Sequence, residues 1–439
     1  MGSQRCVDAG LHGCRGRLQD QCMRLFRSRA SNRVGAPEKP GARMTDTGKS
    51  TAQRRALFPR PFLLSAVFAL LATLLLAEVV PRFAPGLLRF DHMMGDLRTA
   101  YLSDRLPSQH PQVAIVSLTD ATLKDSKVRQ PVDRGLLDRI VEAADAAGAA
   151  AIGLDFLFVQ VTPPDNEDLL VDAIRRARAK VVLAAADERV GLGKAQMDRQ
   201  AVFIAKAGRP AGYANLATER DWVIRFRAGP GSGKAYGKSF STLLAESAGA
   251  TANESYRRIA WLLEPHDGYD TFLTIPAETL LQAQTETGGQ LARAGLKGKI
   301  VIVGGTFPDI DRHLTPLSSP TGELQPGALI HAHMVAELVD KRHINQLETN
   351  SLAMKLELMA LAALAFLVGW RTRMRGQGLL FGTAATVAII AVDTFVFWYW
   401  RIILPVVLAL IAWFLGGFTG NHIGRWLGSR AARSRGIVE

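Results

Sequence analysis

The 439-residue sequence is poor in cysteine, and this scarcity excludes several protein classes. Only three cysteines are present, Cys6, Cys14 and Cys22, all near the start. This number excludes a disulfide-rich scaffold, a four-cysteine zinc site and an iron–sulfur cluster protein. Charged residues make up 21% of the chain and hydrophobic residues 48%. This composition excludes a wholly disordered chain and a collagen-like repeat.

Catalytic motifs are also missing from the sequence. There is no G-x-S-x-G nucleophile elbow, and no H-E-x-x-H metal-binding pair. Residues 228–235 nearly fit a phosphate-binding loop, but neither possible register has every required residue, so we interpret this segment as a turn. The sequence therefore gives no reason to predict an enzyme, a catalytic residue or a cofactor.

Net positive charge is confined to three short flanks. The formal net charge is +13, and residues 1–60, 371–378 and 421–439 contribute +9, +3 and +3, which leaves −2 for the rest of the chain. A nucleic-acid-binding protein concentrates basic residues on its folded part. We therefore predict no nucleic-acid partner. Basic flanks beside apolar segments are instead typical of membrane proteins.

Four long apolar runs predict four transmembrane helices, with the lipid bilayer as a partner. A helix needs about 20 apolar residues to cross the hydrocarbon layer. The first run has no charged residue between Phe62 and Ala77, and the fourth has none at all. The four predicted spans are residues 61–80, 351–370, 379–400 and 402–420.

The same basic flanks predict the orientation of the spans. Because cytoplasmic segments carry an excess of Lys and Arg, we expect a disordered tail over residues 1–60, the loop after the second span and the tail over residues 421–439 in the cytoplasm. Residues 81–350 then lie outside. We interpret the first run as an uncleaved anchor, because no clear signal-peptide cleavage site follows it. Residues 1–43 are either part of the disordered tail or precede a true start at Met44.

Residues 81–350 alternate apolar, β-rich segments with helical ones. Strands are predicted over residues 112–118, 149–155, 180–185 and 299–305, and helices over residues 133–147, 168–178 and 327–340. Asn166 is expected to cap the second helix. Two further segments, 211–216 and 222–228, predict an antiparallel insertion. Because a β-α-β-α-β order implies a parallel sheet, the predicted fold class is α/β, with a mixed, mainly parallel sheet, helices on its faces and a helical membrane region.

Seven segments of the chain occur in a characteristic order. They are FD followed by Arg98, VAIVSLTDATL, AAGAAAIGLDFLF, KVVLAA, AGYANLATERDWVIRF, LKGKIVIVGGTFPDIDRHLTPL and PGALIHAHMVAELVD. Together they resemble the second type of CHASE domain, the extracytoplasmic sensory module of bacterial receptors, over about residues 81–350. The resemblance extends to three trailing transmembrane helices and implies a bacterial plasma-membrane sensor. That family normally continues into an output domain, whereas only 19 residues follow residue 420 here.

Polar residues at the ends of predicted strands form a candidate ligand site. Asp120 and Asp155 each end a parallel strand, and Gly304, Gly305 and Thr306 end another. Ligands of open α/β sheets bind beyond the carboxyl ends of the strands. We therefore expect these residues to share one edge and to bind a cation, an amine or a polyol. The structural alternative is that the aspartates cap helices or order loops and the glycines form tight turns.

Five further residues, Asp309, Asp311, His313, His331 and His333, are of metal-ligating types. His331 and His333 are two residues apart in a predicted helix, and such side chains point in different directions. We therefore predict no metal site. His331 is expected to make a structural hydrogen bond near the edge of the domain.

Asp393 is the charged residue of the third predicted span. A carboxylate inside a membrane is unfavourable, and it is usually paired or functional. We expect Asp393 to pair with Arg401 or to face the interior of the helix bundle. A structural pair is favoured over a proton relay, because the span contains no second acidic residue.

Two functional hypotheses follow from these observations. In the first, the protein is a membrane-anchored sensor or signalling-accessory protein that binds a small ligand and acts through a separate membrane or cytoplasmic partner. In the second, it is a structural or assembly factor of an envelope or membrane complex, with the outer domain as a docking surface. The resemblance supports the first hypothesis, and the missing output domain favours the second.

Overall fold

The computed structural model describes residues 59–124, 130–233, 235–251, 257–282, 286–347, 351–372 and 378–434. The three cysteines, Met44 and nearly all of the tail over residues 1–60 lie outside these ranges. The same holds for residues 373–377, which form most of the predicted basic loop, and for the last five residues of the chain.

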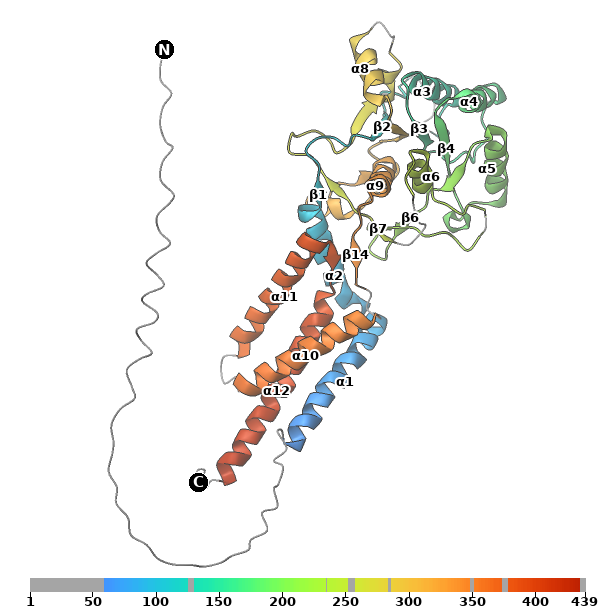
Figure 1. Ribbon diagram of the computed structural model, residues 1–439. Coiled ribbons are helices and arrows are strands. Elements are labelled where there is room, and N and C mark those ends of the chain that lie inside the picture. Colours follow the sequence, from blue (N-terminus) through green and yellow to red (C-terminus); the bar gives the residue numbers. More distant parts are fainter. Residues whose placement is uncertain are drawn as a thin grey trace, which may run out of the picture. The chain divides into compact units, whose positions relative to one another are not determined.

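A six-stranded parallel sheet forms the centre of an α/β domain (Figure 1). The strands β2, β3, β4 and β11 match the four predicted ones, and their interiors are buried on both faces, as expected of a parallel sheet. In spatial order the strands are β10 (Leu273–Pro276), β2 (Val113–Leu118), β11 (Ile300–Gly305), β3 (Ala151–Leu154), β4 (Lys180–Ala185) and β5 (Ala211–Tyr213).

Helices cover both faces of this sheet because strand side chains alternate between the faces. Val116 and Leu118 belong to one apolar cluster, and Val113 and Ile115 belong to the other. The first cluster includes residues of α3 (Arg134–Ala146), α4 (Pro164–Arg176), α5 (Lys194–Ala207), α7 (Ala277–Leu280) and α8 (Thr287–Leu296). The second includes residues of α6 (Phe240–Ser247) and α9 (Gly327–Asp340).

Several small strand pairs surround the main sheet. An antiparallel sheet contains β6 (Leu216–Thr218), β7 (Ile224–Arg227) and β8 (Arg257–Arg258). The two-residue strands pair as β1 (Asp104–Arg105) with β9 (Leu262–Leu263), β12 (Arg312–His313) with β13 (Gln325–Pro326), and β14 (Asn345–Gln346) with β15 (Ile402–Ile403). Two short 3-10 helices cover Glu188–Val190 and Pro316–Ser318.

Two local predictions are wrong. Asn166 does not cap α4, which begins at Pro164 after Pro163, and its amide instead donates to Asp133 Oδ1 at 2.9 Å. The proline favours the first helical turn because its fixed φ suits that position. In addition, the first strand of the predicted antiparallel insertion, β5, pairs in parallel with β4 of the main sheet, and only β6 to β8 are antiparallel.

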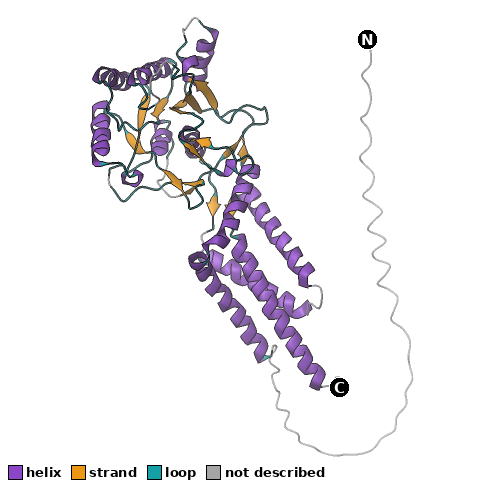
Figure 2. Ribbon diagram, turned by 180° about the vertical axis from the view of Figure 1, so that it is seen from behind, coloured by secondary structure: helices purple, strands orange, loops and turns teal. Residues whose placement is uncertain are grey.

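Five long helices accompany the α/β domain, and Figure 2 shows this part of the chain as almost entirely helical. They are α1 (Arg60–Phe83), α2 (Pro85–Leu102), α10 (Leu352–Thr372), α11 (Gly378–Trp400) and α12 (Val406–Ser434). All except α2 are long and apolar enough to cross a membrane. Ile402 and Ile403, expected at the start of the fourth span, lie in β15, and α12 continues through most of the predicted basic tail.

The helices α10 and α12 pack through glycines. A Cβ atom at Gly416 or Gly420 would overlap the backbone carbonyl oxygen of Ala362 or Phe366. Together with Gly424, these residues recur at every fourth position, as in the small-residue motifs that let membrane helices approach closely. The two helix backbones therefore touch, whereas α11 is mostly exposed within the described residues.

Candidate ligand-binding cavity

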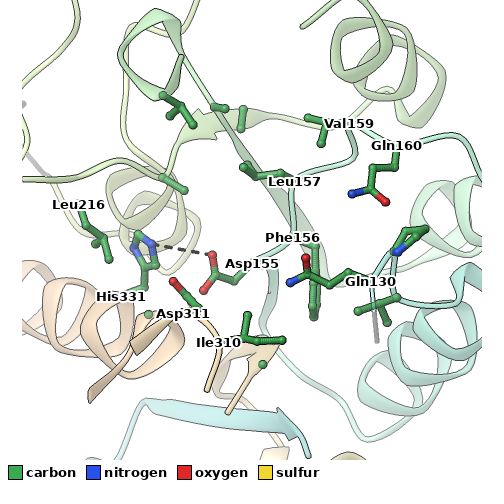
Figure 3. Close-up of a pocket in the computed structure, with 18 of the residues that line it drawn as sticks. Gln130, Asp155, Phe156, Leu157, Val159, Gln160, Leu216, Ile310, Asp311 and His331 are labelled. Carbon is green, nitrogen blue, oxygen red and sulfur yellow. Dashed lines mark ion pairs between the residues drawn. The ribbon is translucent and has the colours of Figure 1, made fainter. Parts of the chain in front are cut away.

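A cavity of about 360 Å³ lies at the carboxyl ends of β3, β4, β5 and β11 (Figure 3). This is the edge where open parallel sheets bind ligands. Its lining combines carboxylates, amides and apolar side chains. Among the lining residues are Gln130, Arg134, Asp155, Phe156, Leu157, Val159, Gln160, Asn215, Leu216, Gly305, Phe307, Ile310, Asp311, Gly327 and His331.

Asp155 immediately follows β3, and its carboxyl group faces the cavity. Only 12% of its side chain is exposed. The His331 imidazole lies beside it, with Nε2 3.8 Å from Asp155 Oδ1. Burial, followed by the negative charge of Asp311, raises the pKa of Asp155 well above its usual range. A protonated carboxyl group is therefore favoured here when the cavity contains no cation.

Asp311 lies on the loop after β11 and has the left-handed backbone conformation, with φ of 55°. This turn places its carboxylate over Gly327, the first residue of α9, where the helix dipole favours negative charge. His313 Nε2 lies 2.8 Å from Asp311 Oδ1. Burial opposes ionisation, but the bond to His313 and the nearby histidines outweigh it and lower the pKa of Asp311.

Two glycines leave room for these two carboxyl groups. A Cβ atom at Gly304 would lie 3.4 Å from Asp155 Oδ2 and 2.6 Å from Ala328 Cβ. A Cβ atom at Gly327 would overlap the carboxylate of Asp311. The sheet edge and the start of α9 can therefore approach the acidic side chains only because these positions lack side chains.

His331 and His333 point in different directions from α9, as predicted. His331 Nδ1 lies 3.0 Å from Ser241 Oγ, whereas His333 Nδ1 accepts a hydrogen bond from the Leu262 backbone N–H at 3.3 Å. Burial lowers the pKa of His331 to about 4, so the imidazole is neutral at physiological pH. The predicted hydrogen bond of His331 is confirmed. In the described part of the chain, no group of three His, Cys, Asp or Glu side chains is arranged to hold a metal ion.

The structure brings together part of the predicted site. As expected, the strands that precede Asp120, Asp155 and Thr306 are neighbours in one parallel sheet. Asp155 and Gly305 line the cavity and Gly304 lies beside it, while the Thr306 hydroxyl bonds the Leu118 carbonyl oxygen at 3.4 Å.

Asp120 does not line the cavity. It lies in the turn after β2, where Thr119 and Thr122 bond Glu278 at the start of α7. The intervening strand β11 separates this turn from the end of β3. Neither Asp120 nor Asp155 caps the following helix, because the N-caps of α3 and α4 are Asp133 and Pro163.

Sequence reasoning did not place Asp311 in the ligand site, although it noted the residue as a metal-ligating type. Two amide residues of the lining, Gln130 and Asn215, were not noted at all. The available signal was Gly327 at the start of a strongly predicted helix, since glycine there allows a side chain from another segment to approach the helix N-terminus.

A second polar cluster joins α2 to the α/β domain. Asp96 of α2 accepts hydrogen bonds from Arg225 Nε and Nη2 at 2.8 and 2.6 Å, and from Arg258 Nη2 at 3.1 Å. Arg225 also bonds Glu219 and Asp221. The side chains of Asp96, Arg225 and Arg258 are at most 5% exposed. A bidentate pair of this kind fixes the orientation of its two segments.

Other side chains of α2 contact the apolar helices α11 and α12. Arg98 forms an ion pair with Asp393 of α11, and both side chains are 3% exposed. Asp91 accepts a hydrogen bond from the Val407 N–H of α12 at 2.9 Å. Of the two alternatives expected for Asp393, pairing with Arg401 is wrong, because Arg401 follows the end of α11 and pairs with Asp104 instead. The other alternative agrees with the structure, because Asp393 is buried and forms a structural pair. The helix α2, which sequence reasoning did not identify, brings Arg98 to Asp393.

A comparison with known protein families matches the CHASE2 domain to residues 67–371, well over half of the chain. The chain belongs to the CHASE2 domain family. The match begins inside α1 and ends inside α10, so it includes α2, the cavity and the α/β sheet. CHASE2 is an extracytoplasmic sensory domain, which agrees with the resemblance seen in the sequence. No curated protein and no solved structure matches the chain.

Proposed function

We propose that this CHASE2 protein is a membrane-anchored sensor that spans the membrane four times and acts through a separate partner that supplies the output. Both termini are placed in the cytoplasm, and the α/β domain is placed outside. The four apolar helices and the three basic flanks support this topology.

The observation that carries this proposal is the position of α2 between two buried polar clusters. Asp96 is fixed to Arg225 and Arg258 of the α/β domain, and Arg98, two residues later, is fixed to Asp393 of α11. Removing one partner of a buried ion pair is strongly destabilising. A displacement of β7 or β8 is therefore expected to move α2, and α11 with it, rather than to leave α2 in place while the contacts of Asp96 rearrange.

The mobile element of the proposed mechanism is α11. It packs less extensively within the described structure than α10 and α12, whose backbones are in contact. A change in the α/β domain would therefore shift α11 relative to a tight α10–α12 pair. A partner in the membrane or the cytoplasm would then recognise the changed arrangement.

Affinity purification of the full chain in a mild detergent tests this mechanism. The variant Asp96→Asn weakens the attachment of α2, and Asp172→Asn, an exposed position on α4, is the matched control. We expect a co-purifying partner whose recovery changes several-fold in Asp96→Asn but not in Asp172→Asn. Equal recovery of the partner with the unmodified protein and with both variants would support a passive docking role instead.

Reporter fusions test the topology separately. A reporter that is active only outside the cytoplasm should be active when fused after residue 346 and silent when fused after residue 375 or at residue 439. Activity at residue 439 would contradict the proposed even number of spans.

A further inference from the structure

One wall of the cavity is acidic, and the remaining walls are mostly apolar or carry amides. Figure 3 shows the carboxyl groups of Asp155 and Asp311 beside His331. Phe156, Leu157, Val159 and Ile310 contribute apolar surface, and Gln130 and Gln160 contribute amides. At about 360 Å³, the volume is within the range of small-molecule sites.

The Asp155 carboxyl group lacks the donors that a purely structural role would supply, whereas Asp311 interacts with His313. No described residue donates a hydrogen bond to the Asp155 carboxyl group, and the Nε2 atom of the neutral His331 imidazole is 3.8 Å away. Buried polar atoms in proteins are nearly always hydrogen-bonded. Asp155 is nevertheless 88% buried, as its 12% exposure implies, and its position depends on the missing side chain at Gly304.

On the basis of the sensor role proposed above, we infer that the cavity binds a small organic ammonium ion, with its N–H groups donating to Asp155 and Asp311. An ammonium group supplies three donors and one positive charge, which match two facing carboxyl groups. Its organic part would lie against Phe156, Leu157 and Ile310.

The other charged and titratable groups of the cavity do not replace this cation. His331 on α9 is neutral because of its burial, and His313 on β12 interacts with Asp311. Arg134 on α3 lies over the Phe158 ring, 4.5 Å from its centroid, and it is influenced by the charge of Glu167. Asp155 and Asp311 therefore remain the groups that an incoming ammonium ion would contact.

Binding of the ammonium ion is coupled to loss of a proton. Without the ammonium ion, burial and the charge of Asp311 raise the pKa of Asp155 and so favour its protonated form. When the ammonium ion enters, the Asp155 carboxyl group releases its proton to solvent and becomes a carboxylate, which leaves one cation between two anions. The affinity is therefore expected to increase with pH until Asp155 is ionised in the empty protein.

Isothermal titration calorimetry of the full chain in detergent tests this assignment. The probes are 2-phenylethylamine, its neutral counterpart 2-phenylethanol, the anion phenylacetate, and Mg²⁺ alone. We expect binding of the amine only, and titrations in two buffers of different ionisation enthalpy should show proton release. The variants Asp155→Asn and Asp311→Asn should each weaken amine binding by about 10- to 100-fold, the usual range for a hydrogen bond to a charged group.

Asp309→Asn is the matched control, because it removes a carboxylate from the same loop without altering the cavity lining. Its amine affinity should equal that of the unmodified protein, and melting temperatures verify that all variants are folded. Equal binding of the alcohol, preferential binding of phenylacetate or Mg²⁺, or no binding of the amine would overturn the assignment. These outcomes are independent of the partner-recovery experiment, so the sensor proposal can survive a failure of the ligand assignment.

Discussion

The α/β domain and the apolar helices are held together by different interactions. The sheet of the α/β domain is buried by large aliphatic side chains from two helix layers, and the release of water from these surfaces stabilises it. The pair α10 and α12 instead brings backbones together at Gly416 and Gly420. Within a bilayer there is no such release of water, and close packing and buried polar pairs become decisive. The predictions below test this contrast, from the largest expected effect to the smallest.

The largest effect is expected for the ion pair between α2 and α11. Arg98→Met should leave the buried Asp393 carboxylate without its partner and lower the free energy of unfolding by about 3–5 kcal/mol. Thermal unfolding of the detergent-solubilised protein measures the change. The double variant Arg98→Met/Asp393→Asn should recover much of the stability, since the isolated charge is gone and the amide still accepts from the Leu404 N–H. A double variant as unstable as the single one would contradict the ion-pair explanation.

A pH-dependent effect of intermediate size is expected in the α/β domain. Burial raises the pKa of Glu337 from 4.5 to about 7, against the opposing charge of Arg227, whose Nε lies 3.5 Å away. The folded state therefore binds the proton more tightly than the unfolded state. The resulting stabilisation is complete below about pH 4.5 and is lost as the pH rises through about 7.

The variant Glu337→Gln measures this contribution. Between pH 5 and 8, roughly the range in which Glu337 ionises, the melting temperature of the unmodified protein should fall relative to that of the variant. The difference between the two proteins is the useful quantity, because His331 and His333 have lowered pKa values and act in the opposite direction. Glu142→Gln, at an exposed position on α3, should show no such trend. A constant difference for Glu337→Gln would exclude the raised pKa.

The glycine contact between α10 and α12 can be tested with a single added methyl group. Gly420→Ala places a Cβ atom against the Phe366 carbonyl oxygen and should destabilise the protein by about 1–3 kcal/mol, as overpacking does. Gly417→Ala is the control in the same helix, because its Cβ would lie 3.9 Å from the Ala365 carbonyl oxygen, an ordinary van der Waals contact. Thermal unfolding in detergent should separate the two variants. Equal melting temperatures would show that close backbone contact does not stabilise this pair.

The smallest effect is expected at an exposed ion pair of the α/β domain. Arg176 of α4 and Glu142 of α3 lie 3.3 Å apart with side chains 66% and 56% exposed. Arg176→Gln should change the free energy of unfolding by less than about 1 kcal/mol, because solvent and salt screen such pairs. Urea unfolding at two salt concentrations measures this change. A loss comparable to that of Arg98→Met would contradict the contrast between buried and exposed pairs.

The long, strongly patterned elements could be predicted from the sequence. The apolar runs within α1, α10 and α11, the strands β2 and β11 and the helix α9 all have a periodicity or a length that permits one local structure. The sheet edge that carries Asp155 also followed from the order of strands and helices, since parallel strands place their carboxyl ends together. The separate helices and strands depend on interactions between residues that are close in the sequence, and the shared edge follows from the general geometry of parallel sheets.

The partners of the polar residues were decided by the tertiary structure. Asp155 meets Asp311 only because the loop after β11 turns back over Gly327, and Asp120 is kept away by the turn bonded to Glu278. Asp393 pairs with Arg98, about 300 residues earlier in the chain, rather than with nearby Arg401. Sequence patterning specifies which side chains need a partner, because burial of a charge is unfavourable. The partner itself depends on contacts between distant segments, which local periodicity does not encode.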